Sequence, residues 1–285
     1  MTQTVLILGA SGKIGKHAAK AFAHAGWTVK MYDRERGDMT AAAQGVQVIV
    51  NGLNPPNYHN WAGIIPQITR DVIAAAKASG ATVIIPGNIY NFGGVNGVID
   101  ETTPQRPCSK KGQIRVEMEA AYRASGVQTI VLRAGNFMDP ERNKDVFSML
   151  VANKARKGLI TAMGDPQATQ AYAYLPDWAQ VAFKLAERRD SLSTFEDVPF
   201  GGYAFSAEEL GGFVTCEIGR EVKVKQFAWW MMSATAPFWE LAREFKEMRY
   251  LMEMSHSMSD TKLKALVPDF TPTDQATAIR ACLPS

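Results

Sequence analysis

The chain has 285 residues, of which 46% are hydrophobic and 21% charged, as is usual for a globular enzyme of one or two domains. Its net charge of +3, with no cluster of basic residues, argues against nucleic acid as a partner. Three scattered cysteines and four histidines lack the spacings of disulfide frameworks and metal sites, so we expect a reducing, cytoplasmic location and no bound metal.

The first predicted element is a short apolar strand that runs directly into a glycine-rich turn. Val5–Leu8 have the pattern of a buried strand, and Gly9, Gly12 and Gly15 follow at intervals of three. Apolar side chains recur on one helical face of residues 14–25, which predicts an amphipathic helix. A helix N-terminus favours an anion such as a dinucleotide pyrophosphate. The alternative is a glycine-rich surface loop.

Each glycine of this turn has a distinct expected role. Gly9 permits the tight turn, Gly12 lets the backbone approach the phosphates, and Gly15 allows the helix to pack closely on the strand. The turn therefore predicts a nucleotide-binding βαβ unit.

The second strand ends in a carboxylate. Val29–Tyr32 form the strand, and Asp33 follows about 20 residues after the glycines, where an acidic side chain accepts a hydrogen bond from an adenosine ribose. Asp33 favours NAD, because it would repel the 2′-phosphate of NADP. Arg34, Arg36 and Lys13 would neutralise that phosphate if Asp33 turned away, so NADP stays an alternative.

Strands and helices continue to alternate up to about residue 140. The strands are almost wholly apolar, as expected when helices cover both faces of a parallel sheet. We therefore predict an α/β fold with a doubly wound parallel Rossmann sheet. The further predicted strands are residues 46–50, 82–85 and 129–132, and the further predicted helices are residues 64–79 and 114–124.

The alternation ends beyond this point, which predicts a smaller, mixed and mainly helical C-terminal lobe. We divide the chain into a dinucleotide-binding domain, residues 1–160, and a substrate-binding lobe, residues 161–285. The boundary is interleaved, because the helix predicted over 176–188 is expected to pack on the first domain. The other predicted elements are helices over 145–157 and from a capping box at Ser206 and Glu209 to Gly219, and strands over 171–175 and 221–227.

The longest apolar stretch, Phe227–Trp239, is interrupted by polar residues and is too short to span a bilayer. We expect no stable membrane association, and no basic amphipathic helix favours membrane-surface docking. The stretch could line an apolar substrate pocket, form a dimer contact or belong to the ordinary core. The N-terminus has no basic region before its apolar run, so we expect no signal peptide.

Taken in order, these segments resemble the extended and atypical short-chain dehydrogenase/reductases, the family of the NAD-dependent epimerase/dehydratases. The glycine spacing and Asp33 match that family's cofactor motif. The resemblance implies hydride exchange at the nicotinamide with a small organic substrate, by an oxidoreductase or an epimerase. The other matching segments are Ile84–Gly93, Leu132–Pro140, which is similar to the "LRxxNxYGP" stretch, Tyr174–Asp177 and the "DxxK" stretch at Asp260.

The catalytic positions depart from the family pattern. The family uses a Tyr-x-x-x-Lys pair, but none of the eight tyrosines is followed by a lysine four residues later. The alignment puts Lys111 at the tyrosine position, Arg115 at the lysine position and Asn88 at the Ser/Thr position. Lys111 could act as the acid or base beside Arg115, or Tyr90 could supply the hydroxyl. Alternatively, Lys111 is simply a solvated surface lysine. In a third interpretation the site binds the cofactor without catalysis, as in a silent sensor or regulatory protein.

The loop after the third strand is also a candidate, either as a cofactor contact or as a plain turn. Tyr58, His59 and Trp61 would then face substrate or pack the loop. We expect no partner beyond the small-molecule substrate and a possible homodimer. The catalytic candidates are Asn88, Tyr90, Lys111 and Arg115, and the cofactor-binding candidates are Gly9, Ser11, Gly12, Lys13, Ile14, Gly15, Asp33, Arg34, Asn51, Gly52, Leu53, Pro86, Gly87, Arg115, Ala134, Gly135 and Asn136.

Overall fold

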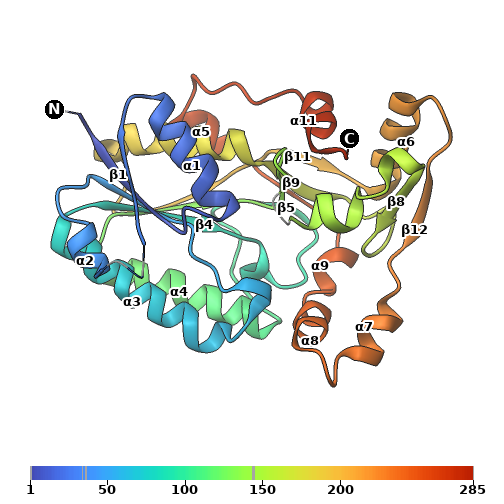
Figure 1. Cartoon of the computed structure of the whole chain (residues 1–285), viewed down its shortest axis with the longest axis horizontal. Coiled ribbons are helices and arrows are strands. Elements are labelled where there is room, and N and C mark those ends of the chain that lie inside the picture. Colours follow the sequence, from blue (N-terminus) through green and yellow to red (C-terminus); the bar gives the residue numbers. More distant parts are fainter. Residues whose placement is uncertain (1, 34, 36, 143–144, 285) are drawn as a thin grey trace.

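A six-stranded parallel sheet forms the centre of the computed structural model, which describes residues 2–33, 35, 37–142 and 145–284. Its strand order is β10-β6-β4-β3-β1-β2. Helices cover both faces, which confirms the doubly wound Rossmann sheet (Figure 1). The strands are β1 (Thr4–Leu8), β2 (Thr28–Met31), β3 (Val48–Asn51), β4 (Thr82–Gly87), β6 (Thr129–Arg133) and β10 (Phe195–Pro199).

One pair of helices lies above the sheet in Figure 1 and a second group lies below it. The upper pair is α1 (Lys13–His24) and α5 (Leu175–Glu187), and the lower group is α2 (Met39–Ala42), α3 (Trp61–Ser79) and α4 (Lys110–Ser125).

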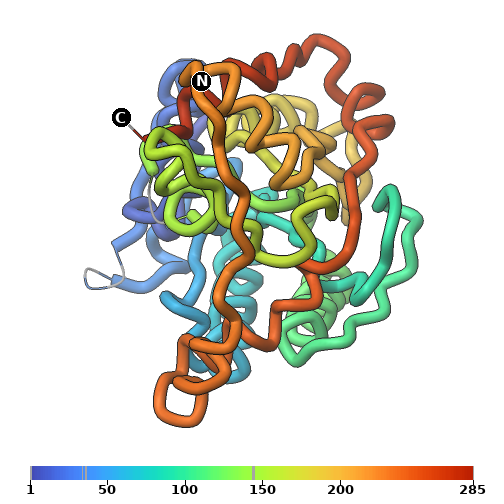
Figure 2. The backbone as a smooth tube through the Cα atoms, turned by 90° about the vertical axis from the view of Figure 1, so that its right-hand side faces the viewer, coloured from blue at the N-terminus to red at the C-terminus, as the bar shows by residue number. Residues whose placement is uncertain are grey.

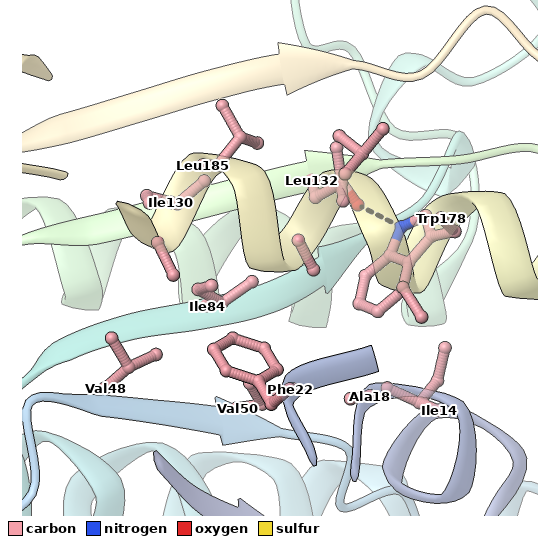
Figure 3. Packing of buried hydrophobic residues seen from close by; sticks show 14 of the residues in the cluster. Ile14, Ala18, Phe22, Val48, Val50, Ile84, Ile130, Leu132, Trp178 and Leu185 are labelled. Carbon is pink, nitrogen blue, oxygen red and sulfur yellow. Dashed lines mark hydrogen bonds between the residues drawn. The ribbon is translucent and has the colours of Figure 1, made fainter. Parts of the chain in front are cut away.

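The upper hydrophobic core joins early and late parts of the chain. Phe22 of α1 packs among sheet residues such as Ile84 and among residues of α5, as Figure 3 shows. Trp178 of α5 is fully buried, and its Nε1 donates to the carbonyl oxygen of Leu132 at 3.2 Å. The helix expected over residues 176–188 therefore packs on the first half of the chain.

The sixth strand, β10, was not expected from the sequence. It pairs in parallel with β6 at the edge of the sheet. Glu196 and Asp197 interrupt the apolar pattern that marks the other strands, and Pro199 is tolerated because an edge strand leaves one side unpaired. The division of the chain at residue 160 stays a prediction, and α5 and β10 are later elements that return to the sheet.

Three small sheets and several short helices make up most of the rest of the molecule, and β5 and β7 come from the first half of the chain. The sheets are β11-β9-β7, β12-β8 and β13-β5. The strands are β5 (Gly97–Ile99), β7 (Asn136–Met138), β8 (Leu159–Ala162), β9 (Gln170–Tyr174), β11 (Tyr203–Phe205), β12 (Lys223–Gln226) and β13 (His256–Met258), and the helices are α6 (Ala207–Ile218), α7 (Trp229–Thr235), α8 (Glu240–Glu247), α9 (Tyr250–Glu253), α10 (Thr261–Leu266) and α11 (Gln275–Cys282).

The helix predicted over residues 145–157 is wrong, whereas the predicted capping box is confirmed. Residues Phe147–Val151 form one π-helical turn, in which the Ala152 amide donates to the Phe147 carbonyl at 2.8 Å. Ala155–Lys157 form a separate 3₁₀-helical turn. The π-helical turn brings Phe147, Val151 and Ala152 together into the core of the lobe, so packing overrides the helical spacing. Ser206 and Glu209 cap α6 reciprocally.

The segment of α7 and α8 projects from the body of the molecule, as the orange loop at the bottom of Figure 2 shows. Trp229 is buried in the lobe, whereas Phe238 is 94% exposed and Trp230 is 73% exposed. The aromatic stretch therefore contributes only partly to the core. In the part of the chain that the structure describes, no helix combines the length and the apolar character needed to cross a bilayer.

Candidate functional site

The glycine turn after β1 leaves one open face. A Cβ atom added at Gly9 would lie 2.9 Å from the Gly52 oxygen, and one added at Gly15 would lie 2.3 Å from the Gly9 oxygen. Both glycines therefore permit close backbone packing. Among the described residues outside its own helix and chain neighbours, a Cβ added at Gly12 would meet only the Gly9 oxygen, at 3.3 Å, so this side of the turn has space for a ligand.

The N-terminus of α1 opens onto this face. Its N-cap residue is Gly12, which has no side chain to satisfy the first N–H groups. Lys13 and Lys16 stand in the first turn, which holds no acidic residue. Burial lowers the pKa of Lys13, while Asp145 and Asp139 act to raise it. Ser11 is exposed at the tip of the turn. This arrangement fits the pyrophosphate of a dinucleotide.

The loop after β3 is built against the glycine turn. Asn51 is buried, accepts the Leu53 amide at 3.1 Å and donates from Nδ2 to the Tyr122 hydroxyl at 3.3 Å. These bonds hold Gly52 where an added Cβ would lie 3.0 Å from the Leu8 oxygen. The loop is thus packed closely against the glycine turn, and its role as a cofactor contact stays a prediction.

Asp33 is exposed beyond the end of β2, where it accepts the Glu35 amide at 3.0 Å. Its neighbours Arg34 and Arg36, proposed as alternative phosphate contacts, lie outside the described residues.

Arg115 projects from α4 to the end of β4. Its Nη2 donates to the Pro86 oxygen at 2.7 Å, beside Gly87. The guanidinium carbon lies 5.9 Å from the centre of the Trp61 ring. Burial lowers the pKa of Arg115, and its buried Nε has no partner among the described residues. A buried donor without an acceptor is costly, which suits a group that meets a ligand.

Two tyrosines meet beside these groups. The hydroxyls of Tyr58 and Tyr90 lie 3.3 Å apart, and the Trp61 ring stacks on Tyr90 with centroids 6.3 Å apart. Asn88 accepts the Tyr90 amide at 3.0 Å, which fixes the local turn. The neighbouring Tyr90 and burial raise the pKa of Tyr58 well above its ordinary value. Tyr58 is therefore a weaker acid than an ordinary tyrosine, and its neutral hydroxyl can donate or accept a hydrogen bond.

The backbone that holds Tyr58 is strained. Asn57, Tyr58 and Asn60 have φ values of 53°, 60° and 42°, and they are three of the four non-glycine residues with positive φ in the described ranges. Such strain is concentrated at functional sites in proteins. The sequence singled out Tyr58 and Trp61 only as possible substrate contacts, because no sequence signal reveals the left-handed backbone.

Lys111 is not a solvated surface lysine. It is 1% exposed in the first turn of α4, and its Nζ donates to Glu247 at 2.6 Å and also to Glu244, both on α8. Glu247 accepts the Lys111 backbone amide at 3.0 Å as well. The ammonium group lies 5.3 Å from the Tyr58 ring centre. The carboxylates of α8 thus tie Lys111 beside the tyrosine pair.

We expect Lys111→Met to loosen α8 and to lower the free energy of unfolding by about 1–3 kcal/mol, because two carboxylates lose a charged donor. Thermal melting and the rate of tryptic cleavage within α8 would measure this. The matched control is Lys110→Met, which changes an exposed neighbour. Lost turnover with unchanged melting and cleavage would instead place Lys111 in the chemistry.

A fully buried arginine holds the backbone next to the tyrosine pair in place. Arg133 of β6 donates to the Asn88 oxygen at 2.7 Å, to Glu119 of α4 at 2.8 Å and to Asp197 of β10 at 2.6 Å. Interaction with Arg133 lowers the pKa of Glu119 against the effect of burial. The network fixes the segment that carries Asn88 and Tyr90. Sequence reasoning placed Arg133 in a motif but gave it no partner.

A pocket opens beyond the end of β6. The chain passes through Ala134 and Gly135, where an added Cβ would lie 2.3 Å from the Ala171 oxygen, to Asn136 at the pocket wall. Phe147, Tyr172 and other residues of the lobe complete the wall. Asn136 thus lies in the wall of this pocket and also near the carboxyl edge of the sheet, where we predict the cofactor. Among the described residues, no group of His, Cys, Asp or Glu side chains could hold a metal ion.

Comparisons with known proteins agree with this geometry. A family model described as the NAD dependent epimerase/dehydratase family matches residues 5–201. A comparison with curated proteins gave no match.

Several solved structures share the fold. MoeE5 in complex with UDP-glucose and NAD superimposes with a TM-score of 0.77 at 15% identity, covering 98% of this chain and 97% of that one. UDP-glucuronic acid 4-epimerase from Bacillus cereus, in complex with UDP-glucuronic acid and NAD, gives 0.77 at 14% identity over 98% of both chains. UDP-glucose 4-epimerase from Brucella ovis, in complex with NAD, gives 0.75 at 18% identity over 99% and 97%.

Proposed function

Since the chain belongs to the NAD-dependent epimerase/dehydratase family, we propose that it binds NAD along the carboxyl edge of its sheet and acts as an oxidoreductase or epimerase on a small organic substrate. The observation that carries the proposal is the open face of Gly12 at the N-terminus of α1. Anions bind at such helix ends, and dinucleotides bind where the strands of an open sheet end.

Residues along this edge match successive parts of the cofactor. The turn from Gly9 to Gly15 would hold the pyrophosphate, and Asp33 would accept the adenosine ribose hydroxyl. Arg115, next to Pro86 and Gly87, would donate to the second ribose. The solved neighbours named above contain NAD, and the match at the family level supports the same cofactor here.

NAD, when bound, supplies hydride exchange at the nicotinamide. The protein's part is to hold the substrate oxygen and to move its proton, and Tyr90 is our candidate for that role. Its hydroxyl already has a hydrogen-bonding partner in Tyr58 at 3.3 Å, and Asn88 orders its backbone. A positioned acid or base of this kind contributes about 10²–10⁴-fold to the rate.

The second candidate function is that of a sensor that binds NAD without turnover. The observation in its favour is Lys111, whose ammonium is occupied by Glu244 and Glu247 instead of activating a tyrosine. Absorbance of the nicotinamide, together with chromatographic detection of an epimerised product, followed with varied alcohols and carbonyl compounds, separates the two. Tight NAD binding without turnover of any compound would support the sensor.

Titration calorimetry with NAD and NADP tests the cofactor assignment. We expect wild-type protein to prefer NAD, and Asp33→Ala to weaken NAD binding about 10–100-fold and to lose the preference, because a charged hydrogen bond contributes about 1.5–3 kcal/mol. The control is Asp190→Ala, whose carboxylate is exposed in a distant turn. Unchanged preference in Asp33→Ala would refute ribose recognition by Asp33, and absence of binding in wild type would refute the proposed function.

A further inference from the structure

The segment formed by α7 and α8 carries a group of exposed apolar side chains, which we call the α7–α8 patch. Its members are Trp230, Met231, Phe238 and Trp239, which are 73%, 52%, 94% and 47% exposed. The segment projects from the body of the molecule (Figure 2), and residues 226–239 include no charged residue. A single exposed apolar residue is ordinary, but several together mark an interaction surface.

The base of this segment is anchored in the lobe. Trp229 is buried, its Nε1 donates to the Met163 oxygen at 2.5 Å, and its ring stacks on Phe245 with centroids 5.4 Å apart. Further along α8, Glu247 contacts the ammonium group of Lys111 at 2.6 Å. The patch is therefore carried on packed helices, and a partner would meet a largely preformed surface at a small cost in conformational entropy.

The other large exposed apolar side chains that the structure describes are far apart in the sequence. They are Met31 at the end of β2, Val98 in β5 and Met149 in the π-helical turn. Within the described residues, the α7–α8 patch is thus the one place where such side chains are neighbours along the chain.

The area of the patch agrees with what a stable dimer needs. Aromatic side chains have about 150–250 Å² of surface each, so at these exposures the patch presents on the order of 400–500 Å² of apolar area. Each partner of a standard interface buries about 800 Å². In homodimers about 65% of that area is apolar, or about 500 Å² for each partner. Two copies paired through this patch would have the usual size and composition.

The charges around the patch favour a second copy over a lipid surface. Glu240 and Arg243, the first charged residues after the patch, have opposite signs, so this rim is complementary to itself across a two-fold axis. An anionic membrane instead attracts a surplus of basic residues. The flanking segments have as many acidic as basic residues, namely Glu221, Glu240, Glu244, Glu247 and Glu253 against Lys223, Lys225, Arg243, Lys246 and Arg249.

From these features we infer that two copies of the chain associate through the α7–α8 patch in a two-fold dimer. Each copy supplies the same side chains, so the contact closes at two copies. Of the six tryptophans, Trp230 and Trp239 are the only exposed ones, and both belong to the patch. Association would therefore transfer the two solvent-exposed indoles to an apolar environment.

Sedimentation velocity and tryptophan fluorescence of the full chain test this inference. The protein is measured from about 0.1 to 100 μM, a range that brackets a micromolar dissociation constant. We expect a dimer at the upper end, and dilution that dissociates it should shift the emission to longer wavelength. A monomer throughout the range would overturn the inference, and so would a continuing series of larger species.

Two variants locate the contact. Trp230→Ser and Phe238→Ser are each expected to raise the dimer dissociation constant at least about tenfold, because buried aromatic side chains dominate such interfaces. Thermal melting should stay at the wild-type value, since both side chains are already exposed in the monomer. The matched control is Val98→Ser, which removes an exposed apolar side chain from β5 and should leave the constant unchanged. A dimer that both patch variants leave intact would overturn the inference.

Flotation with lipid vesicles tests the other possible occupant of the patch. Wild-type protein is mixed with vesicles of phosphatidylcholine, with and without phosphatidylserine, and we expect no protein to float with either. Vesicle binding that Trp230→Ser and Phe238→Ser abolish would identify a bilayer as the occupant and overturn the inference. None of these measurements uses NAD, so their outcome is independent of the proposed function.

Discussion

Replacement of Tyr90 by phenylalanine is expected to lower kcat by about 10²–10⁴-fold while NAD affinity stays unchanged. The substitution keeps the ring that stacks on Trp61 and removes only the hydroxyl that meets Tyr58 at 3.3 Å. If this hydroxyl transfers the substrate proton, its loss affects the transition state more than cofactor binding. Steady-state kinetics on a responding substrate, with calorimetry for NAD, would measure both.

Two further Tyr→Phe variants serve as comparisons for the kcat of Tyr90→Phe. Tyr58→Phe removes the partner hydroxyl and is expected to lower kcat less than Tyr90→Phe does. Tyr203→Phe removes a hydroxyl that donates to the Thr273 oxygen at 2.5 Å, and it should leave kcat unchanged. Turnover of Tyr90→Phe at the wild-type rate would exclude Tyr90 as the proton-transfer group and would return attention to Lys111.

Arg133→Met is expected to lower the free energy of unfolding by about 3–5 kcal/mol. The arginine is fully buried, and its removal leaves Glu119 and Asp197 without the cation that both carboxylates contact. It also removes the donor to the Asn88 oxygen. Urea denaturation followed by circular dichroism would give the change, and we expect the segment around Tyr90 to lose order at the same time.

A surface ion pair provides the comparison. Lys184 contacts Asp269 at 2.6 Å, but both side chains are partly or largely exposed to solvent. Lys184→Met is expected to change stability by less than about 1 kcal/mol. An equally small loss in Arg133→Met would mean that the buried network does not stabilise the fold, whatever its geometry.

Much of the Rossmann half could be predicted because its information is local. The strands β1, β3, β4 and β6 are continuous apolar runs, and the glycine turn has a unique spacing. The strand β10 escaped prediction because Glu196 and Asp197 look like surface residues. Asp197 is stabilised in the sheet by hydrogen bonds from Arg133, which lies far away in the sequence. A charge whose partner is distant in sequence carries no local signal.

The candidate site was also only partly predictable, because several of its contacts join residues that are distant in the sequence. The motifs located Asn88, Tyr90 and Arg115 at one edge of the sheet, since parallel strands end together. Lys111 was ambiguous, because its two carboxylate partners come from α8. The pairing of Tyr58 with Tyr90 depends on a backbone conformation that the residue types do not favour.

The left-handed backbone at Asn57, Tyr58 and Asn60 implies a conflict between thermal stability and activity. Glycine adopts positive φ without a steric penalty, so a library screened only for resistance to heating would favour glycine at Asn57 or Asn60. A more flexible segment would hold the Tyr58 phenol less firmly. Selection for stability alone would then disturb the geometry that we propose for proton transfer, and a screen that also scores product formation would keep the asparagines.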